Sequence, residues 1–582
     1  MTEPEIARPI RPLTAVTARL LVSGGPFEME VVDVNGVATR VWKHALPHLR
    51  AVVEDAPRHG DTAALVYGDE RLTYSEFHRH TATLARRLAE DYGVAKGDRV
   101  AIAMRNYPEW VVAFFAAVSL GAIAVPLNSW WTGPELEFGL ADSGARVLVA
   151  DRERIASLRE ALERLELSVV AVRTGGAGLP PGARTWENVL GEVAPDAGLP
   201  PADLAADEPC ALFYTSGTTG RPKGAVASHR NLASNLVAGS YSRFRSLMRL
   251  GLEMHEVQAF VDALPPSVIL CALPLFHATG AQTVMLPTLA NGGTLLLMYR
   301  WDAEEALRLV ERERVSGITA VPAMISQMLA SPSLKDRDLS SLMVLGSGGA
   351  PAAPALVSRA RAVSGLQNAL LGQGYGLTEC SATATVNGGS DYLLRPDSAG
   401  LPVATVDVKI VDAGEAELPP GEVGEVWIRG PGVVHGYWNR PDATAATFTE
   451  GWLRTGDLGR LDEEGFLYIV DRATDMIIRG GENVYCAEVE AAIHEHPAVG
   501  EVAVVGVPHE VYGEEVGAVV RLIPGRELTE EELVAYLKPR IAPFKIPTHI
   551  RITAEDLPRN AAGKLLKRQV RQAHGWDRAE QA

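Results

Sequence analysis

Cysteine is scarce in this sequence, and the few thiols lie far apart. The 582 residues include four cysteines, Cys210, Cys271, Cys380 and Cys486, so no Cys-x-x-Cys pair offers a metal site or a local redox pair. We expect buried or inert thiols in a reducing compartment. Hydrophobic residues make up 47% of the chain and charged residues 22%, which excludes the disordered, collagen-like and disulfide-rich classes.

An excess of positive charge is also missing. Lys and Arg number 55 against 72 Asp and Glu, which gives a formal net charge of −17. The molecule as a whole should repel nucleic acid and anionic membranes. Residues 1–25 mix acids and bases, with Arg19 inside their only short apolar stretch, unlike a secretory signal. We therefore expect a cytoplasmic protein without a nucleic-acid partner.

The sequence also lacks a long hydrophobic run. The best candidate, residues 111–127, is interrupted by Ser119, Gly121 and Pro126 and is at the short limit for a membrane span. A buried helix that ends near Gly121 and continues into a core strand explains this run better. We therefore expect no transmembrane segment.

The sequence does contain an alternation of helical patterns with short apolar runs, between about residues 73 and 345. Apolar strands that alternate with helices indicate parallel sheets covered on both faces. The alternation predicts a doubly wound α/β body. The apolar runs are residues 99–104, 146–150, 168–172, 293–298 and 342–346.

Two further units follow this alternation. Closely spaced strands with turn signals begin at about residue 399 and predict an antiparallel β unit. Beyond Arg472 the pattern indicates a small α+β domain, with a helix at 530–538 whose start carries the capping-box pair Thr529 and Glu532. We predict an N-terminal body of residues 1–473 and a C-terminal domain of residues 474–582.

The most informative segment for chemistry is residues 212–224, LFYTSGTTGRPKG. An apolar strand runs into glycines and hydroxyl residues, followed by Arg221 and Lys223. Glycines let the backbone turn its N–H groups inward, hydroxyls add donors and cations supply charge, so the composition suits a polyphosphate-binding loop. It is not a Walker loop, because Gly220 is followed by Arg-Pro-Lys.

This string resembles the phosphate-loop signature of the superfamily of acyl-CoA synthetases, peptide-synthetase adenylation domains and firefly-type luciferases. The other motifs of the superfamily follow in order, and the chain looks most like its fatty acyl-CoA ligase branch. They are LPLFHATG (273–280), GSGGAPAAP (346–354), GQGYGLTE (372–379), GWLRTGDLGRLDEEGFLYIVDR (451–472), IIRGGENVYCAEVE (477–490) and PRNAAGK (558–564).

The resemblance implies a site for ATP and Mg²⁺. Thr378 is expected to contact the α-phosphate and Glu379 to hold the cation, while Asp457 and Arg472 bind the ribose hydroxyls. A surface ion pair between Asp457 and Arg472 is the structural alternative. The remaining implied nucleotide contacts are Thr215, Ser216, Gly217, Thr218, Thr219, Gly220, Lys223, Gly348, Gly349, Ala350, Pro351, Gln373, Gly374, Tyr375, Gly376 and Lys564.

The resemblance also implies an acyl pocket, in which small residues leave room for the substrate. No charged residue in these segments suggests a counter-ion for an amino acid, so an apolar acid is favoured, either a medium- or long-chain fatty acid or a bulky polycyclic or aryl acid. For His277, a core position is the alternative. The implied lining residues are Phe276, His277, Gly280, Gly349, Gly372 and Gly374.

Residues 241–269 form a connection longer than the superfamily's usual one. A pocket lid, a surface insertion and an oligomer contact all stay open for this segment, and so does a homodimer.

By resemblance, Lys564 bridges the substrate carboxylate and the α-phosphate in the first of two steps. Attack of a carboxylate on phosphorus brings two anions together, so a fixed cation and Mg²⁺ would stabilise the transition state. A thiol then attacks the acyl-adenylate, which favours a mobile C-terminal domain. The hinge position is Thr474, where Asp or Lys is usual, and the implied coenzyme A channel is Arg479, Gly480, Gly481 and Glu482.

The expected partners are a small carboxylic acid and coenzyme A. Residues 538–571 contain nine Lys or Arg against Glu555 and Asp556, a local charge of +7 that suits the phosphates of the coenzyme. A solvated basic face is the alternative for this strip. Loading of a carrier-protein phosphopantetheine and a non-catalytic nucleotide-binding role are the alternative functions.

Overall fold

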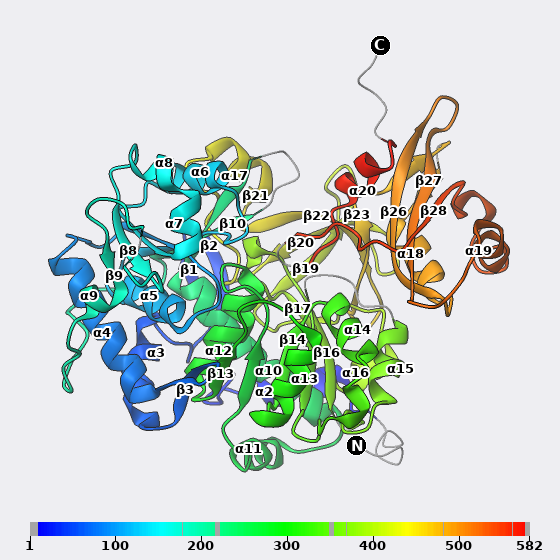
Figure 1. Cartoon of the computed structure of the whole chain (residues 1–582). Coiled ribbons are helices and arrows are strands. Elements are labelled where there is room, and N and C mark those ends of the chain that lie inside the picture. Colours follow the sequence, from blue (N-terminus) through cyan, green and yellow to red (C-terminus); the bar gives the residue numbers. More distant parts are fainter. Residues whose placement is uncertain are drawn as a thin grey trace.

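Two sheets rich in parallel strands form the centre of the large N-terminal part of the chain (Figure 1). The computed structural model describes residues 10–176, 178–215, 221–348, 354–367, 369–480, 482–560 and 563–576. The seven-stranded sheet has the order β11 (Lys223–Ser228), β10 (Pro209–Thr215), β6 (Ile123–Pro126), β5 (Arg99–Ala103), β7 (Val147–Asp151), β8 (Ser168–Val172) and β9 (Arg184–Thr185).

The nine-stranded sheet is mixed, with parallel strands in the middle and antiparallel strands at both edges. Its order is β18 (Leu401–Pro402), β17 (Thr385–Gly388), β16 (Leu370–Tyr375), β15 (Val344–Ser347), β14 (Gly317–Ala320), β12 (Val268–Cys271), β13 (Thr294–Leu297), β3 (Ala63–Tyr67) and β4 (Glu70–Thr73). The predicted apolar runs are therefore confirmed as strands of these two sheets.

Alternate residues of the buried strands pack into different clusters, which is why these runs are apolar throughout. In β5, Val100 and Ile102 join the central cluster with α4 (Tyr74–Glu90) and α5 (Pro108–Ser119). Ala101 and Ala103 face the other way, towards α6 (Gly133–Ser143) and α7 (Arg152–Ser157). Side chains alternate across a strand, so helices on both faces require an unbroken apolar sequence.

The run at 111–127 forms the buried helix α5 followed by β6, as predicted. Gly121 lies between the two elements with φ +77°, a left-handed conformation that favours glycine. No helix in the described ranges has the length and apolar character needed to cross a membrane. All four cysteines are free and buried, and burial raises the pKa of Cys271 to about 12.

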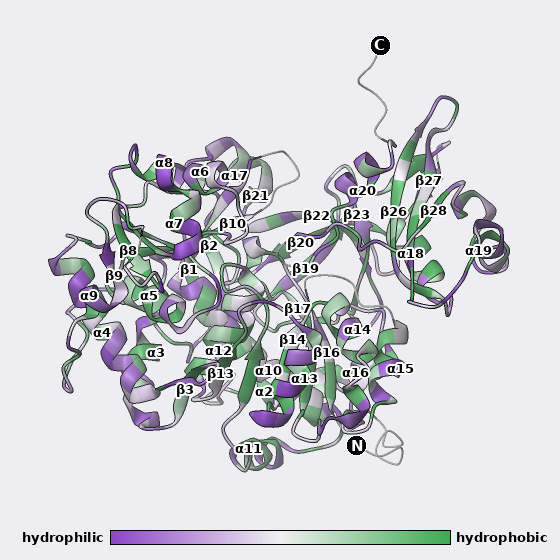
Figure 2. Cartoon of the chain, in the orientation of Figure 1, coloured by the Kyte–Doolittle hydropathy of each residue, from purple (hydrophilic) through white to green (hydrophobic). Residues whose placement is uncertain are grey.

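Further helices cover the nine-stranded sheet on the side away from the central cluster. They are α13 (Ala303–Arg312), α14 (Pro322–Ala330) and α15 (Pro354–Arg361). In Figure 2, α4 and α13 carry purple, hydrophilic residues. The other helices of the body are α2 (Leu13–Leu20), α3 (Arg50–Asp55), α8 (Arg159–Leu162), α9 (Trp186–Leu190), α10 (His229–Arg249), α11 (Met254–Asp262), α12 (Leu286–Ala290), α16 (Ser390–Leu394) and α17 (Pro441–Thr447).

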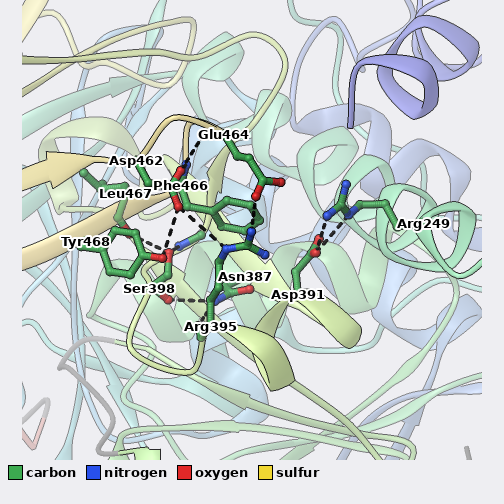
Figure 3. Close-up of polar contacts among 11 residues, drawn as sticks. Arg249, Asn387, Asp391, Arg395, Ser398, Asp462, Glu464, Phe466, Leu467 and Tyr468 are labelled. Atoms are coloured by element: carbon green, nitrogen blue, oxygen red, sulfur yellow. Dashed lines mark hydrogen bonds and ion pairs between the residues drawn. The ribbon is translucent and has the colours of Figure 1, made fainter. Parts of the chain in front are cut away.

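The predicted antiparallel β unit is present as a five-stranded sheet. It consists of β19 (Asp407–Val411), β20 (Gly424–Arg429), β21 (Phe448–Thr449), β22 (Trp452–Leu461) and β23 (Leu467–Arg472). Hydrogen bonds join it to the end of the nine-stranded sheet (Figure 3): Asn387 donates to the Ser398 carbonyl at 2.9 Å, and the Ser398 hydroxyl donates to the Leu467 carbonyl at 2.8 Å. A small hairpin, β1 (Met29–Val34) and β2 (Val37–Trp42), completes the strands of the body.

The smaller C-terminal domain, drawn in orange and red in Figure 1, lies to one side of the body and is called the lid below. Its sheet contains β24 (Ile477–Arg479), β25 (Glu482–Val484), β26 (Val499–His509), β27 (Gly513–Leu522) and β28 (His549–Thr553). Helices α18 (Cys486–His494) and α19 (Glu530–Leu537) cover one face, and α20 (Lys567–Ala573) covers the other. The predicted capping box of Thr529 and Glu532 begins α19.

Candidate active site

The predicted phosphate loop joins two paired strands, β10 and β11. Thr215 and Lys223 face each other across this antiparallel pair. The Lys223 ammonium lies 5.0 Å from the ring centre of Tyr437. The Lys223 cation therefore lies against the face of the Tyr437 ring.

A second group lies where β16 ends and a short helical turn, η4 (Thr378–Cys380), begins. Gly376 must lack a side chain here, because a Cβ atom would meet the Ala382 carbonyl oxygen at 2.5 Å. The chain thereby turns tightly and brings Thr378 and Glu379 into η4. The Tyr437 hydroxyl donates a 2.7 Å hydrogen bond to Oε1 of Glu379.

Tyr437 is a functional candidate that sequence reasoning missed. It links Lys223 of the phosphate-loop hairpin to Glu379, and its backbone forms a bridge with Ala225 of β11. Burial raises the pKa of Tyr437, and the neighbouring Glu379 carboxylate adds to this rise, so the phenol stays a hydrogen-bond donor. In the sequence alone, nothing about Tyr437 and Trp438 indicates a chemical role.

Asp457 and Arg472 are direct partners across β22 and β23. The Arg472 Nε lies 3.1 Å from Oδ1 of Asp457, and the Tyr375 hydroxyl donates to Oδ2 at 2.7 Å. The two residues do form the alternative ion pair, but Asp457 is only 5% exposed, so this is not a surface pair. Three predicted nucleotide contacts, one of them from β16, therefore meet in one cluster.

His277 precedes a π-helical turn, η2 (Thr279–Met285), a geometry frequent at functional sites. Burial, together with a smaller effect of the Lys564 ammonium, lowers the pKa of His277 to about 4, so the ring is neutral at pH 7. Its Nδ1 is buried and lacks a hydrogen-bond partner among the described residues, as do Gln373 Oε1 and Ser347 Oγ. Such unsatisfied polar atoms fit a site that receives its partners from a ligand.

Lys564 enters this region from the lid. Its loop is closed by a 2.9 Å hydrogen bond from the Lys564 backbone N–H to Oδ1 of Asn560, and Arg559 donates to the Gly563 carbonyl at 2.8 Å. Burial and the Arg472 guanidinium lower the pKa of Lys564 to about 8, against the opposing effect of Asp457. Within the described part of the chain, no carboxylate lies at ion-pair distance from its ammonium group.

The Lys564 loop touches the body next to Gly563. This residue has φ +78°, and a Cβ atom placed on it would meet Cγ2 of Val321, just before α14, at 2.7 Å. Both the backbone conformation and the close approach therefore require glycine. The lid is docked in this structure with its lysine towards the body.

The small residues of the predicted acyl pocket serve different purposes. The interpretation that Gly280 leaves room for a substrate is wrong, because a Cβ there would meet the Pro274 carbonyl oxygen at 2.2 Å. Gly372 is also closely packed, with Asn387 O at 3.2 Å from the same position, whereas Gly348 and Gly374 have ordinary contact distances. Close backbone packing explains the first two glycines.

The predicted hinge and thiol channel lie at the start of the lid. Thr474 is exposed in the turn between β23 and β24. The Arg479 guanidinium lies 4.7 Å from the Tyr512 ring centre and 3.4 Å from Glu515, while Glu482 and Gly480 are exposed. Several predicted site residues lie outside the described residues: Ser216, Gly217, Thr218, Thr219, Gly220, Gly349, Ala350, Pro351 and Gly481.

The residues present fit a magnesium ion bound through substrate phosphates. In the described ranges, no group of three or more His, Cys, Asp or Glu side chains is arranged to hold a metal. Glu379 uses Oε1 for Tyr437 and keeps its other oxygen for a cation. A single carboxylate together with phosphate oxygens and water is a normal environment for Mg²⁺.

The buried Asp457–Arg472–Tyr375 cluster and a lysine carried by a second domain are typical of a two-domain nucleotide-activating enzyme. Comparison with known families agrees. Residues 52–438 match the model of the AMP-binding enzyme family and residues 488–564 match its C-terminal domain, so the chain belongs to this family.

Individual relatives indicate which members of this family the chain resembles. Feruloyl-CoA synthase of Amycolatopsis sp. is 38% identical over 531 residues, 91% of this chain and 96% of the relative. Long-chain-fatty-acid–CoA ligase FadD13 of Mycobacterium tuberculosis is 35% identical over the same shares. The o-succinylbenzoate CoA synthetase MenE of Bacillus subtilis, solved with its acyl-adenylate, is 30% identical with a TM-score of 0.74, covering 92% and 99% of the two chains.

These relatives share one type of reaction. The protein is an AMP-forming acyl-CoA ligase, and its use of ATP and coenzyme A follows from that class.

Proposed function

We propose that this ligase activates a largely apolar carboxylic acid, aryl or fatty, and that Lys564 of the lid and the Asp457–Arg472 cluster of the body act together in the first step. The observation that carries the proposal is that charged groups of the lid and the body lie close together. Arg472 lowers and Asp457 raises the pKa of Lys564, and Lys564 lowers the pKa of His277. Perturbed pKa values of this kind cluster at functional sites.

In the first step, a carboxylate oxygen attacks the α-phosphorus of ATP, the bond to the bridging oxygen breaks and pyrophosphate leaves. Lys564 stabilises the negative charge that gathers between the two anions, and Thr378 donates to the α-phosphate. Asp457 accepts from the ribose hydroxyls, while Arg472 and Tyr375 hold its carboxylate in place. A magnesium ion on Glu379 would supply charge neutralisation for the phosphates.

In the second step, the thiol of coenzyme A attacks the acyl carbon, a thioester forms and AMP leaves. Lys564 has no function in this step, so the lid must turn about Thr474 and present the segment at Arg479–Glu482 as a wall of the thiol channel. The exposure of Thr474 in a turn between two sheets supports this location of the hinge. The basic strip 538–571 supports coenzyme A over a carrier protein as acceptor.

The neutral His277 ring supports an apolar acid at this site. With a pKa of about 4, it adds no charge beside the acyl group at pH 7. The similarity to a feruloyl-CoA synthase and to a long-chain-fatty-acid ligase supports aryl-propenoic and fatty acids as the first candidates.

The test is a pyrophosphate-release screen of the full chain over fatty, aryl and terpenoid acids, with and without coenzyme A. We expect pyrophosphate, AMP and acyl-CoA in equal amounts with at least one acid, and loss of turnover when magnesium is chelated. Release of AMP with a phosphopantetheinylated carrier protein but not with coenzyme A would identify the alternative acceptor. Formation of ADP and phosphate would contradict the mechanism.

A further inference from the structure

Asp471 is a buried carboxylate that the proposed mechanism does not use. It lies in β23 next to Arg472, three residues before the proposed hinge at Thr474, and it is 7% exposed. Successive side chains of a strand point to opposite faces, so Asp471 faces away from the pair of Arg472 and Asp457. A carboxylate in such a buried position is unfavourable unless hydrogen-bond donors or a cation compensate it.

The two oxygens of Asp471 have partners in different domains. Oδ1 accepts a 2.8 Å hydrogen bond from the backbone N–H of Arg472 in the body. Oδ2 accepts from the backbone N–H of Cys486, which is the first residue of the lid helix α18. The N–H groups of the first helical turn have no partner within a helix, and a helix N-terminus favours negative charge. One carboxylate therefore binds both a strand of the body and a helix of the lid.

The hydrogen bond between Asp471 and Cys486 crosses the proposed hinge. Asp471 precedes Thr474 and Cys486 follows it, and α18 packs against β23 (Figure 1). Within the lid, the Cys486 thiol donates to the Asp475 carbonyl at 3.0 Å, which ties the start of α18 to the segment just beyond the hinge. Rotation of the lid about Thr474 would move Cys486 relative to Asp471. Their hydrogen bond therefore belongs to the orientation in which Lys564 is directed towards the body.

A lysine of the lid adds a charge to this contact. The Lys567 ammonium, at the start of α20, lies 2.9 Å from Oε1 of Glu490 in α18, and the same oxygen accepts from the Val504 backbone N–H at 2.8 Å. Burial lowers the pKa of Lys567, but Glu490 and, to a smaller extent, Asp471 raise it above its usual value, so Lys567 is a cation. Burial raises the pKa of Asp471, and Lys567 opposes this rise. Asp471 and Glu490 thus attract the same lid cation from two domains.

Lys567 lies at the base of the loop that carries Lys564. The Leu566 backbone N–H donates to the Pro558 carbonyl at 2.9 Å and so closes this loop, and Lys567 is the next residue in the chain. A short closed loop moves with its base, because few of its backbone torsions are free to change. An attraction that fixes Lys567 relative to Asp471 therefore also fixes the direction from which Lys564 approaches the body.

From these contacts we infer that Asp471 is a positioning residue for Lys564. Its carboxylate holds the start of α18 and attracts Lys567, and it thereby keeps the lid in the orientation that the adenylation step needs. Thioester formation, for which the lid has turned, does not use this contact. The inference rests on the proposed function, because it assigns the docked orientation of the lid to the first of the two steps.

The experiment measures the two half-reactions of the full-length protein separately, each in a single turnover. Adenylation is followed as pyrophosphate release with an accepted acid, and thioester formation starts from a prepared acyl-adenylate and coenzyme A. In Asp471→Asn, the one remaining carbonyl oxygen cannot accept both N–H groups from their two directions, and the charge is lost. We expect adenylation to fall by about tenfold or more, as for a lost charge-assisted hydrogen bond, and thioester formation to stay within about twofold of the wild type.

Asp462→Asn is the matched control. Asp462 lies in the turn between β22 and β23, and its Oδ1 alone accepts from the backbone N–H groups of Glu464 and Phe466, at 3.0 and 2.9 Å. An asparagine oxygen can replace this acceptor, and both of these N–H groups belong to the body. Both half-reactions of Asp462→Asn should keep the wild-type rate.

A double variant separates positioning of Lys564 from damage to the nucleotide site next to Arg472. Asp471→Asn added to Lys564→Ala should cost less than about twofold in adenylation, because no lysine is left to position. Lys567→Met leaves Asp471 in place and should also lower adenylation selectively, and it decides the test if circular dichroism shows Asp471→Asn to be unfolded.

Three results would overturn the inference alone: unchanged adenylation in Asp471→Asn, equal losses in the two half-reactions, or the same loss with and without Lys564. A wild type that releases no pyrophosphate with any acid would overturn the proposed function, and the inference with it.

Discussion

The two halves of the proposed site are held in different ways. In the body, Asp457 is bound by Tyr375 and Arg472, and Glu379 by Tyr437, all with partners on neighbouring strands or segments of the body. In the lid, the backbone of Lys564 is fixed by Asn560, but its ammonium group has no ion pair in the described ranges. The body groups are preorganised, whereas the lysine is delivered by a loop that can leave.

This difference agrees with a reaction in two steps. The body fixes the groups that bind the nucleotide in both steps, so these groups do not have to be repositioned when the lid moves. The group needed only in the first step makes its contacts with the ligand rather than with the protein. We therefore expect the contact of Gly563 with Val321 to control how tightly the lid docks on the body.

The largest effect is expected when the delivered charge is removed. Lys564→Ala should lower the adenylation rate by about 10²- to 10³-fold, because a fixed transition-state donor is lost. The measurement is acid-dependent pyrophosphate release at saturating ATP. Lys538→Ala, an exposed lid lysine, is the matched control and should keep the wild-type rate.

A smaller effect is expected at the docking contact. Gly563→Ala forces a side chain into a left-handed residue and against Val321, which costs about 1–3 kcal/mol, or about 5- to 160-fold in adenylation. Adding Val321→Ala should return part of the rate, since it removes the steric half of the cost. If the double variant is no faster than the single one, the loop does not dock at Val321.

The fixed half of the site is tested by Tyr437→Phe. Loss of its hydrogen bond to Glu379 should cost about 1–1.5 kcal/mol, or about 5- to 13-fold in kcat/KM for MgATP. Tyr485→Phe in the lid is the control, because its hydroxyl makes no hydrogen bond within the described residues. An unchanged magnesium dependence in Tyr437→Phe would separate this tyrosine from the cation site.

The smallest effect at neutral pH comes from the ionisation of Lys564. Its pKa of about 8 in the free protein lies below the usual value, so the active protonated form predominates at pH 7 and is lost as the pH rises through about 8. kcat/KM for adenylation should therefore fall by about half at pH 8 and about tenfold by pH 9. Lys564→Arg should move this fall to higher pH, because guanidinium stays charged. A profile that is flat to pH 9.5 would contradict the assignment.

The sequence predicts much of this molecule because many of its signals are local. Apolar runs such as 146–150, the capping box of Thr529 and Glu532, and the strand pair that frames the phosphate loop need no distant partner to be recognised. The sequence also offers the pairing of Asp457 with Arg472 as an alternative, but it does not predict that Asp457 is buried.

What the sequence did not predict depends on contacts across the fold. Tyr437 matters because β11 brings it beside Glu379, 58 residues away in the chain. The sequence suggests that Gly280 leaves open space, but in the structure Gly280 packs closely against the backbone of Leu273 and Pro274.

The most direct test of the comparison between body and lid is the second half-reaction of Lys564→Ala. The variant is given a chemically prepared acyl-adenylate of an accepted acid together with coenzyme A, and the formation of acyl-CoA is followed in a single turnover. We predict a rate within about twofold of the wild type, although the same variant fails in adenylation. A loss as large as that in the first step would contradict a lysine that serves the first step alone.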